Sequence, residues 1–406
     1  MTGNDGSGAP PARPTLGILG GGQLGMMLGH AAARLGVGVR FLDPAGPAAP
    51  AAVAGPVIEG EIDDARALDA LVKDIALVTY ESENVPMSTA RFLVRRAAFH
   101  PSMAALEAAQ DRAFEKEMFN RLGIATAPWA VVSTADDLEP AATRTGFPAI
   151  LKTRRMGYDG KGQARVSDAA GLAAAWAAMA GEPCVLEGVV AFRRELSIIA
   201  VRGLGMTAPE LMDDPEIDGP PVAFYPLVEN THRDGILRRS VAPAPGLHPA
   251  TTAAAEAAAR AVLEATDYTG TLAIEFFECE GTLAPAGTGP DGAPDSPVLV
   301  ANEMAPRVHN SGHWSIEGAE TSQFENHVRA VAGMALGPTA ARGPCAMVNL
   351  IGGLPDPHAV LAVPGTHWHD YGKTPMPGRK LGHVTVTGAT PEEVAGRVRA
   401  VEALLP

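Results

Sequence analysis

The sequence predicts an α/β chain, α+β overall, that is divided into several domains. From Thr15 onward it alternates strand, glycine turn, helix and strand, which indicates a parallel sheet covered by helices over residues 15–108. A glycine-rich basic loop follows a strand that carries Lys152, and short strands return from about residue 345. Residues 1–14 are polar and rich in Gly and Pro, so we expect a disordered tail there.

Composition limits the classes of partner. The 406 residues are 46% hydrophobic and carry a net charge of -14, which disfavours a broad nucleic-acid or anionic-membrane surface and leaves small molecules as the expected ligands. No apolar run approaches the ~18 residues of a membrane span. Cys184, Cys279 and Cys345 are widely separated, as expected of reduced core thiols in the cytoplasm rather than of disulfides or a thiolate metal site.

The first motif is GGGQLG at 20–25, which fits GxGxxG between a predicted strand and the predicted helix QLGMMLGHAAARLG. The next strand, VGVRFLDP, brings Asp43, and together these features match the fingerprint of a Rossmann-like domain. Such a turn directs backbone N–H groups at an anion, so a dinucleotide and a monophosphate fit equally well. A turn that only packs strand against helix is the alternative.

Two glutamates follow the next predicted strand, which ends at Tyr80. TYESENVP places Glu81, Glu83 and Asn84 at the carboxyl end of that strand, where ligands bind in open α/β sheets. These side chains can bind hydroxyls or amines, and the sequence does not decide which glutamate faces the ligand. A helix cap before the helix around Phe92 is the alternative.

A long helix is predicted over 110–122, with Phe114, Met118 and Leu122 on one face and Gly123 at its end. Beyond it, strands AILK, CVLEGVV and ELSIIAVR surround one alanine-rich helix and indicate a small α+β subdomain over about 130–202.

This subdomain carries the loop MGYDGKGQ at 156–163. Its glycines let the backbone approach phosphates, and Lys152 and Lys161 supply positive charge, which is typical of a lid over a nucleotide; an ordinary hairpin is the alternative. The apolar edge after Glu187 can hold an adenine ring and Glu195 can bind ribose hydroxyls, unless both glutamates only form surface ion pairs.

Carboxylates interrupt two apolar strands of the next region. After FYPLVEN and a helix over 250–265, the strands TLAIEFFE and VLVANEM carry Glu275, Asn302 and Glu303, and a last helix lies near 321–335. Buried carboxylates need a cation or hydrogen-bond partners, so this set predicts a magnesium site, with ion pairs to Arg307 or a lysine as the alternative. The Gly/Pro-rich residues 281–297 are predicted to be an exposed hairpin insertion.

Basic residues and histidines cluster after these strands. In PRVHNSGHW, the spacing of His309 and His313 raises zinc as a possibility, but the Asn-Ser-Gly turn between them favours an anion clamp by Arg307. In the C-terminal region, strands CAMVNLIG and HVTVTG flank a loop, HWHDYGKTPMPGRKLGH, that carries Lys373, Arg379 and Lys380 and can bind an anion or be merely solvated.

Taken together, these motifs resemble one family, the ATP-grasp enzyme 5-(carboxyamino)imidazole ribonucleotide synthetase, the ATPase-subunit type of phosphoribosylaminoimidazole carboxylase. The resemblance runs from about Thr15 to the C-terminus and includes, in family order, GGGQLG, TYESENVP, QDRAFEK, LKTRRMGYDGKGQ, FYPLVENTHRDGILRRSVAPAP, IEFFE, NEMAPRVHNSGHW and YGKTPMPGRKLGH. It implies an ATP-grasp fold: a Rossmann-like pre-ATP-grasp domain at 15–108, an ATP-grasp domain at 109–335 with its lid subdomain at about 130–202, and a small β-rich domain at 336–406.

The resemblance also implies roles for individual residues. The residues expected to contact ATP are Arg112, Lys152, Gly157, Tyr158, Asp159, Gly160, Lys161, Gly162, Gln163, Glu187, Gly188, Val189, Val190, Glu195, His232, Asn302 and Glu303. The residues expected to contact the substrate, 5-aminoimidazole ribonucleotide, are Gly22, Gln23, Leu24, Glu81, Tyr158, Lys161, Arg307, His309, Lys373 and Arg379. Glu275 and Glu303 would hold Mg²⁺, and Lys152, Lys161 and Arg307 would be catalytic; the family can carry Arg at 161, so lysine weakens bidentate contact there.

The implied reaction is the ATP-dependent carboxylation of 5-aminoimidazole ribonucleotide by bicarbonate through carboxyphosphate, giving ADP and phosphate in de novo purine (IMP) biosynthesis. The implied assembly is a cytoplasmic homodimer that hands its product to the next enzyme, a mutase. Three alternatives remain: another ATP-grasp carboxylate-amine ligase, including a formate-using relative; an NAD-dependent oxidoreductase using GGGQLG and Asp43; and a catalytically silent nucleotide-binding regulator.

Overall fold

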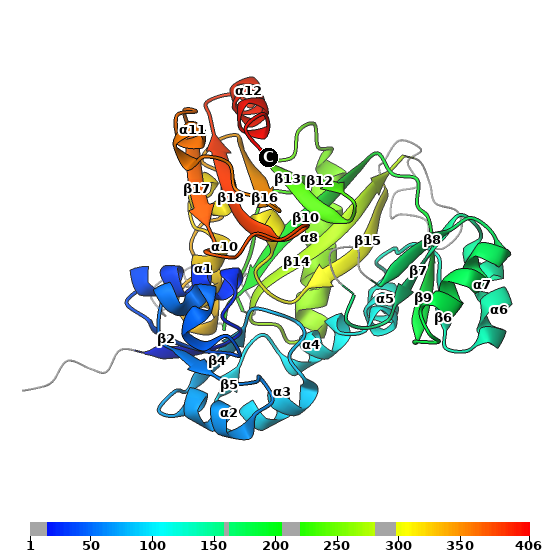
Figure 1. The fold of residues 1–406 in the computed structure, drawn as a ribbon, viewed down its shortest axis with the longest axis horizontal. Helices are drawn as coiled ribbons and strands as arrows, with labels where there is room; N and C mark the ends of the chain where they lie inside the picture. Colours follow the sequence, from blue (N-terminus) through cyan, green and yellow to red (C-terminus); the bar gives the residue numbers. More distant parts are fainter. Residues whose placement is uncertain (1–13, 158–161, 205–219, 281–297) are drawn as a thin grey trace, which may run out of the picture.

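The computed structural model describes residues 14–157, 162–204, 220–280 and 298–406, and their strands form three sheets (Figure 1). A five-stranded parallel sheet lies at lower left, a four-stranded antiparallel sheet at right, and a nine-stranded antiparallel sheet between them. The predicted α/β fold class, α+β overall, is confirmed. The predicted tail up to residue 13, the loop tip at 158–161 and the insertion at 281–297 lie outside the described residues.

The N-terminal sheet has the strand order β3-β2-β1-β4-β5, and each pair is parallel, as predicted. Leu16 and Ile18 of its central strand share a core with Leu28 of α1 and with Phe324 and Val328 of α10, so a late helix completes this domain. The elements are β1 (Thr15–Leu19), α1 (Gln23–Arg34), β2 (Gly38–Asp43), η1 (Gly46–Ala48), η2 (Pro50–Val53), β3 (Val57–Glu59), α2 (Ala65–Val72), β4 (Leu77–Tyr80), α3 (Met87–Leu93), β5 (Ala98–Phe99) and α4 (Met103–Ala109).

Helix α5 (Arg112–Arg121) corresponds to the predicted long helix, but its buried face differs from the prediction. Phe114 is 44% exposed, whereas Glu115, Lys116 and Phe119 are buried. The charged pair occupies interior positions because each side chain has a buried partner: Glu115 accepts a 2.6 Å hydrogen bond from the Met304 amide, and Lys116 pairs with Glu187. The predicted face was therefore wrong at Phe114.

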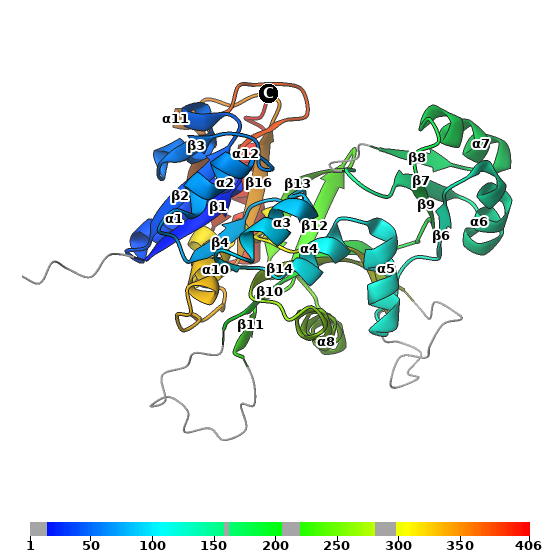
Figure 2. The same cartoon turned by 90° about the horizontal axis from the view of Figure 1, so that it is seen from below.

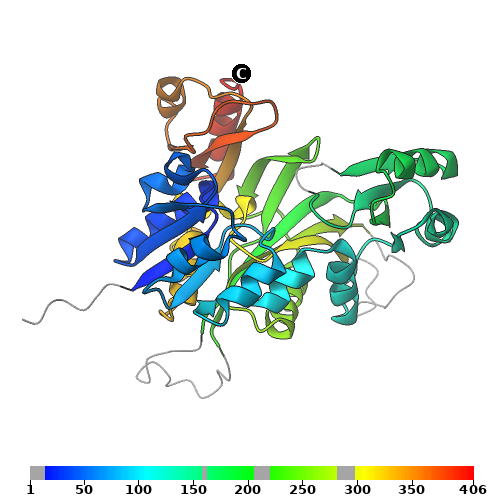
Figure 3. The ribbon, with the colours of Figure 1, turned by 60° about the horizontal axis from the view of Figure 1, so that its bottom comes forward.

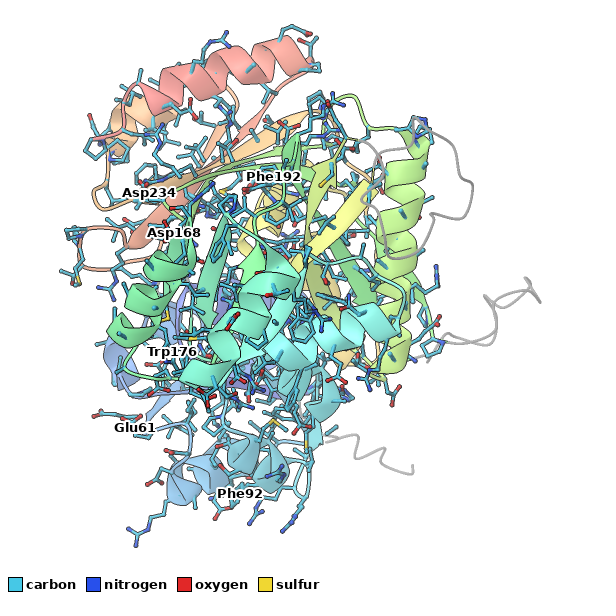
Figure 4. The ribbon with its side chains drawn as sticks, turned by 90° about the vertical axis from the view of Figure 1, so that its right-hand side faces the viewer. Glu61, Phe92, Asp168, Trp176, Phe192 and Asp234 are labelled. Atoms are coloured by element: carbon cyan, nitrogen blue, oxygen red, sulfur yellow. The ribbon has the colours of Figure 1, made fainter. Side chains whose placement is uncertain are left out.

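The lid subdomain contains a four-stranded sheet of order β6-β9-β7-β8 that shares one core with two helices. Figure 2 shows the subdomain standing apart from the N-terminal domain, and Figure 4 looks onto its helix α7, which contains the labelled Trp176 and is capped by the labelled Asp168. Its elements are β6 (Trp129–Val132), η3 (Ala135–Asp137), α6 (Leu138–Thr145), β7 (Ala149–Thr153), β8 (Gln163–Val166), α7 (Ala169–Ala178) and β9 (Cys184–Gly188).

Two expectations for this subdomain were wrong. It has two helices where one was expected; the eight residues of α6 bury only Ala141 fully and so give a weak apolar pattern. The segment ELSIIAVR forms β10 (Arg194–Arg202), which pairs along its whole length with β14 of the central sheet and not with the lid strands. The described lid strands therefore end with β9 at Gly188, well before residue 202.

The central sheet has the order β15-β14-β10-β12-β13-β16-β18-β17, with β11 paired to β10. The predicted helices near 250–265 and 321–335 are present as α8 and α10, while FYPLVEN is interrupted between β11 and β12. The elements are β11 (Val222–Phe224), β12 (Val228–Arg233), β13 (Ile236–Ala242), α8 (Pro249–Ala265), β14 (Gly270–Cys279), β15 (Val298–Ala305), η5 (Asn310–Gly312), α9 (Ser315–Gly318) and α10 (Gln323–Val331).

The C-terminal strands extend this central sheet, because β16 pairs with β13. The predicted strands at CAMVNLIG and HVTVTG are present, but HWHD, expected in a loop, forms a strand against β18. Figure 3 shows these strands, in orange and red, beside the blue N-terminal domain. The elements are β16 (Cys345–Ile351), α11 (Pro357–Leu361), β17 (Thr366–Asp370), β18 (Lys380–Thr387) and α12 (Pro391–Glu402). None of the helices in the described ranges is long and apolar enough to cross a membrane.

Candidate active site

Carboxylates bind the backbone amides of the glycine turn between β1 and α1. The Gly21 amide donates to Asp43 Oδ2 at 2.7 Å, and the amides of Gly22 and Gly25 donate to the two oxygens of Glu81 at 2.5 Å. Burial raises the pKa of Glu81, although these amides oppose the rise. The amides of the turn are therefore bound by side-chain carboxylates from the ends of β2 and β4, the two strands that flank β1 in the sheet. Binding of a ligand anion at the turn stays a prediction.

Glu83 faces a different partner from Glu81. It forms a partly buried, bidentate ion pair with Arg307, whose Nη2 donates to Glu83 Oε1 at 3.0 Å while Nε donates to Oε2. Burial opposes ionisation of Glu83, but the Arg307 charge outweighs it and holds the pKa of this carboxyl below its usual range. The sequence did not distinguish the roles of Glu81 and Glu83, but in the structure they have different partners. Glu81 binds the glycine turn, and Glu83 orients Arg307.

The C-terminal basic loop contacts the N-terminal turn. Lys373 donates from Nζ to Gln23 Oε1, and its charge lowers the pKa of Glu81 against the larger effect of burial. Arg379 instead bonds within its own loop, to the Thr374 carbonyl at 3.2 Å. Of the predicted substrate residues in this loop, Lys373 is brought to the turn.

Lys380 belongs to the basic loop identified in the sequence, but the family resemblance gave it no individual role. Burial raises the pKa of Glu275, and the Lys380 charge opposes this rise. Burial lowers the pKa of His309, and the Lys380 charge lowers it further. It opens β18 directly after Arg379.

Two carboxylates lie side by side on adjacent strands of the central sheet, with the Glu275 side chain 16% and the Glu303 side chain 43% exposed. Glu275 of β14 and Glu303 of β15 are register partners, and the ladder shifts by one residue beside them, leaving Asn302 as the extra residue of a bulge. Burial and the neighbouring Glu303 raise the pKa of Glu275. Burial likewise opposes ionisation of Glu303, yet Arg112 and Lys152 lower its pKa, and Arg112 Nη1 donates to it at 3.0 Å.

This pair fits a hard divalent cation. Two adjacent carboxylates repel, and a cation between them removes that repulsion. Within the described ranges no group of three or more His, Cys, Asp or Glu side chains forms a metal cluster. A Mg²⁺ ion here would therefore complete its coordination with phosphate oxygens and water, as it commonly does in nucleotide sites.

Two lysines share the carboxylate of Glu187. Lys152 Nζ lies 2.9 Å and Lys116 Nζ 3.3 Å from the same oxygen, and Lys116 is only 1% exposed. Burial lowers the pKa of Lys116, and Lys152 adds to this effect while Glu187 opposes it. Lys116 was missed from the sequence, although it stands one helical turn after Arg112 in QDRAFEK.

Glu195 and His232 lie together on β10 and β12, where the His232 Nδ1 hydrogen-bonds to Glu195 Oε2. Burial alone would lower the pKa of His232, but the Glu195 bond and nearby carboxylates raise it. The same face of the sheet carries Glu275, whose charge contributes to this rise. These two residues predicted to contact ATP are therefore adjacent.

The two histidines of PRVHNSGHW have separate surroundings. His309 Nδ1 lies 2.9 Å from Ser311 Oγ and its Nε2 lies 3.5 Å from Glu275 Oε1; burial and Arg307 lower its pKa to about 3. His313 is 1% exposed and packs against the rings of Phe324 and His383. The zinc alternative therefore gains no support in the part of the chain that the structure describes.

The structure thus connects most of the predicted site residues through named contacts. Tyr158, Asp159, Gly160 and Lys161 lie outside the described residues, but the loop is described up to Gly157, whose carbonyl accepts a 3.3 Å hydrogen bond from Arg112 Nη2. The same guanidinium binds Glu303. Arg112 therefore joins the start of the loop to the carboxylate pair.

Comparison with known proteins assigns the family. The model of the ATP-grasp domain matches residues 117–324, that of the ribonucleotide synthetase preATP-grasp domain 14–110, and that of the phosphoribosylaminoimidazole carboxylase C-terminal domain 345–397. The N5-carboxyaminoimidazole ribonucleotide synthase of Pseudomonas aeruginosa is 46% identical over 390 residues, covering 96% of this chain and 99% of the relative. The Brucella melitensis enzyme of the same name is 44% identical and covers 91% and 95%.

Solved structures agree with these relatives. The N5-carboxyaminoimidazole ribonucleotide synthetase of Thermus thermophilus superposes with a TM-score of 0.85 at 47% identity, covering 96% of this chain and 98% of that one. The Aspergillus clavatus synthase, solved in complex with ADP and 5-aminoimidazole ribonucleotide, gives 0.81 at 29% identity and covers 97% and 98%. The resemblance inferred from the motifs is confirmed, and the chain belongs to the N5-carboxyaminoimidazole ribonucleotide synthase family.

Proposed function

We propose that this protein is an ATP-dependent carbon–nitrogen ligase of purine biosynthesis that carboxylates 5-aminoimidazole ribonucleotide with bicarbonate, giving ADP and phosphate. The observation that carries the proposal is the pair of adjacent carboxylates Glu275 and Glu303, set beside Arg112 and Lys152, in a chain that matches synthases of this name over nearly its whole length. A carboxylate pair next to cationic side chains suits phosphoryl transfer, where catalysis consists mostly of positioning and charge neutralisation.

The ATP-binding side is assigned to residues around this pair. Glu275 and Glu303 would hold Mg²⁺, which when bound offsets charge on the phosphates. Lys152 and Arg112 neutralise charge at the same place, because both lower the pKa of Glu303. Glu195 and His232, which lie together on the same sheet, are assigned to the nucleoside end of ATP.

The reaction proceeds in three steps. A bicarbonate oxygen attacks the γ-phosphorus as the bond to ADP breaks, which gives carboxyphosphate. Carboxyphosphate then divides into carbon dioxide and phosphate, and the exocyclic amine of the ribonucleotide attacks carbon dioxide and releases a proton. Water must be excluded while carboxyphosphate exists, and we assign this role to the glycine-rich loop that Arg112 holds at Gly157.

The ribonucleotide is assigned to the space between the glycine turn and Arg307. Glu81 already binds the turn, Lys373 contacts Gln23, and Glu83 orients Arg307, so these groups are prepositioned. Lys380 adds positive charge near His309, which suits a substrate that carries a phosphate and must meet bicarbonate.

A phosphate-release assay tests the proposal. ATP cleavage is expected only when bicarbonate and 5-aminoimidazole ribonucleotide are both present, and the loss of either should return the rate to background. Release that is independent of the ribonucleotide, or that follows another amine, would assign the chain a different carboxylate-amine ligation.

Further parts of the proposal concern assembly and location. We propose a cytoplasmic homodimer with domains at 15–108, 109–335 and 336–406, whose product passes to a mutase. The support is the resemblance of the whole chain to the family and the three cysteines, which are buried free thiols. Light scattering of the purified protein tests the dimer.

A further inference from the structure

Asp111 is a buried carboxylate that the reaction does not itself require. Its side chain is 2% exposed and accepts four hydrogen bonds. One comes from the Ala113 amide at 3.0 Å, which caps helix α5. The others come from Arg154, through Nε at 3.0 Å and Nη2 at 2.8 Å, and from Arg155 Nε at 3.1 Å. Capping of helix α5 requires only the bond from the Ala113 amide, so it does not explain why Asp111 also binds Arg154 and Arg155.

The two arginines lie where the chain leaves the lid sheet for the glycine-rich loop. Strand β7 ends at Thr153, and Arg154 and Arg155 follow directly. Met156 then adopts a φ of 62°, a left-handed conformation that is unfavourable for a residue with a side chain. Its side chain is 74% exposed, so packing of that side chain does not hold the conformation.

Fixed contacts on both sides hold Met156 instead. Asp111 holds the two residues before it, and Arg112 binds the carbonyl of Gly157 after it. Backbone bonds reinforce the arrangement, because the Arg112 amide donates to the Arg154 carbonyl at 3.0 Å. Strained backbone persists where its surroundings determine it, and here the start of α5 supplies those surroundings.

Asp111 and Arg112 are also connected to Glu303 and to the strand that carries Lys152. Arg112 also binds Glu303, and Lys152 precedes Arg154 by two positions on β7. Asp111 and Arg112 therefore tie the body of the protein, through helix α5, to the strand that carries Lys152 and to the entrance of the loop.

We propose that Asp111 is a positioning residue, which clamps Arg154 and Arg155 and so sets the entrance of the glycine-rich loop and the place of Lys152 relative to Glu303. This inference rests on the proposed ATP-dependent carboxylation and adds a residue to it. Loss of the clamp should weaken ATP binding and let water reach carboxyphosphate, so that ATP is cleaved without carboxylation of the amine.

The test compares variants that separate the clamp from the helix cap. Asp111→Asn keeps a side-chain oxygen that can cap α5 but removes the charge that holds the arginines. Arg155→Gln removes one of the two arginines that bind Asp111. Because the Arg155 side chain is 53% exposed, this variant is expected to fold normally. The control is Asp64→Asn, since Asp64 caps α2 through the amides of Arg66 and Ala67, at 2.8 Å each, in the N-terminal domain.

Three quantities are measured for each variant: the melting temperature, the KM for ATP, and the phosphate released per molecule of carboxylated product. We expect roughly a tenfold higher KM and a clear excess of phosphate over product for Asp111→Asn, with a smaller change in the same direction for Arg155→Gln. Asp111→Glu, which retains the charge, should recover part of the loss. Asp64→Asn, which also keeps a capping oxygen, should leave the KM and the phosphate-to-product ratio unchanged and alter the melting temperature little.

The inference is overturned if Asp111→Asn and Arg155→Gln keep the wild-type KM and phosphate-to-product ratio while only their melting temperatures fall. Binding of ADP, followed by calorimetry, separates this result from failure of the proposed function. A wild-type protein that binds ADP but shows no ribonucleotide-dependent turnover would refute the function, and the ADP affinity of Asp111→Asn would still decide the clamp.

Discussion

Glu275 and Glu303 are register partners on adjacent strands, yet their environments shift their pKa values in opposite directions. Burial and the charge of Glu303 raise the pKa of Glu275, whereas Arg112 and Lys152 overcome burial and lower the pKa of Glu303. One carboxylate of the pair is thus neutralised by protein cations, and the other has its ionisation opposed. A divalent cation would supply the positive charge that favours the ionised form of Glu275.

Replacing Glu303 by Gln should abolish ribonucleotide-dependent phosphate release, with a loss of at least about 100-fold. The amide removes the charge that pairs with Arg112 and that is proposed to hold Mg²⁺. Chelation of divalent cations should have the same effect on the wild type. Glu264→Gln, at an exposed position of α8, serves as the control and should retain full activity. Full turnover by Glu303→Gln would remove this residue from the metal role.

Replacing Glu83 by Gln should lower the free energy of unfolding by about 2 kcal/mol, because it leaves the partly buried Arg307 without its charged partner. It should also raise the KM for the ribonucleotide, since Arg307 loses its orientation. Urea denaturation and steady-state kinetics measure the two effects. The control is Asp69→Asn, which breaks an exposed pair with Arg96 and should cost less than about 1 kcal/mol. Equal losses in the two variants would contradict the prediction.

Lys380→Met should reduce kcat/KM for the ribonucleotide more than Arg379→Met does, by roughly tenfold. Lys380 influences the pKa values of His309 and Glu275, whereas Arg379 bonds to the carbonyl of Thr374 in its own loop. Both variants remove one positive charge from neighbouring positions, so each is the control for the other. The opposite order would return the role to Arg379, as the family resemblance implied.

Protonation of His327 should contribute to acid unfolding. Its ring lies between β4 and β14, where Nδ1 accepts from the Thr271 amide at 3.1 Å and Nε2 lies 2.8 Å from Thr79 Oγ1. Burial lowers the pKa of His327 to about 3 in the folded protein, below the ordinary value of 6.5. The folded state therefore favours the neutral ring, and its stabilising contribution is complete above pH 6.5 and declines as the pH falls toward 3.

For this one proton the loss is about 1.4 kcal/mol per pH unit. Urea unfolding at several pH values should show a shallower dependence for His327→Gln than for the wild type. His30→Gln, at an exposed position of α1, should leave the dependence unchanged. An unaltered slope in His327→Gln would mean that this ring does not contribute to acid unfolding.

Local patterns predicted those parts of the site that depend on local structure. GGGQLG could be read as a turn between strand and helix because such a turn is defined by adjacent residues, and its amides bond to the carboxylates of Asp43 and Glu81. Glu275 and Glu303 could be paired because each lies in an apolar strand, and the two predicted strands are consecutive. The residue roles assigned by resemblance remain predictions until they are measured.

Other features depend on partners that the local sequence does not contain. The buried side of α5 was mispredicted because Glu115 bonds to the Met304 amide, 189 positions away. Lys116 was overlooked for the same reason, since its partner Glu187 belongs to the lid. Strand β10 looks like any apolar strand, and only its pairing with β14 assigns it to the central sheet. In each case a distant contact outweighs the local pattern.

The bond between Gln23 and Lys373 joins positions 350 residues apart and has a consequence for biosynthesis. At ribosomal rates of about 5–20 residues per second, the second partner is made roughly 20–70 s after the first. A nascent chain therefore exposes its glycine turn long before the loop that carries Lys373 exists. If the ribonucleotide binds between these two segments as proposed, it can stabilise only chains whose translation has nearly finished.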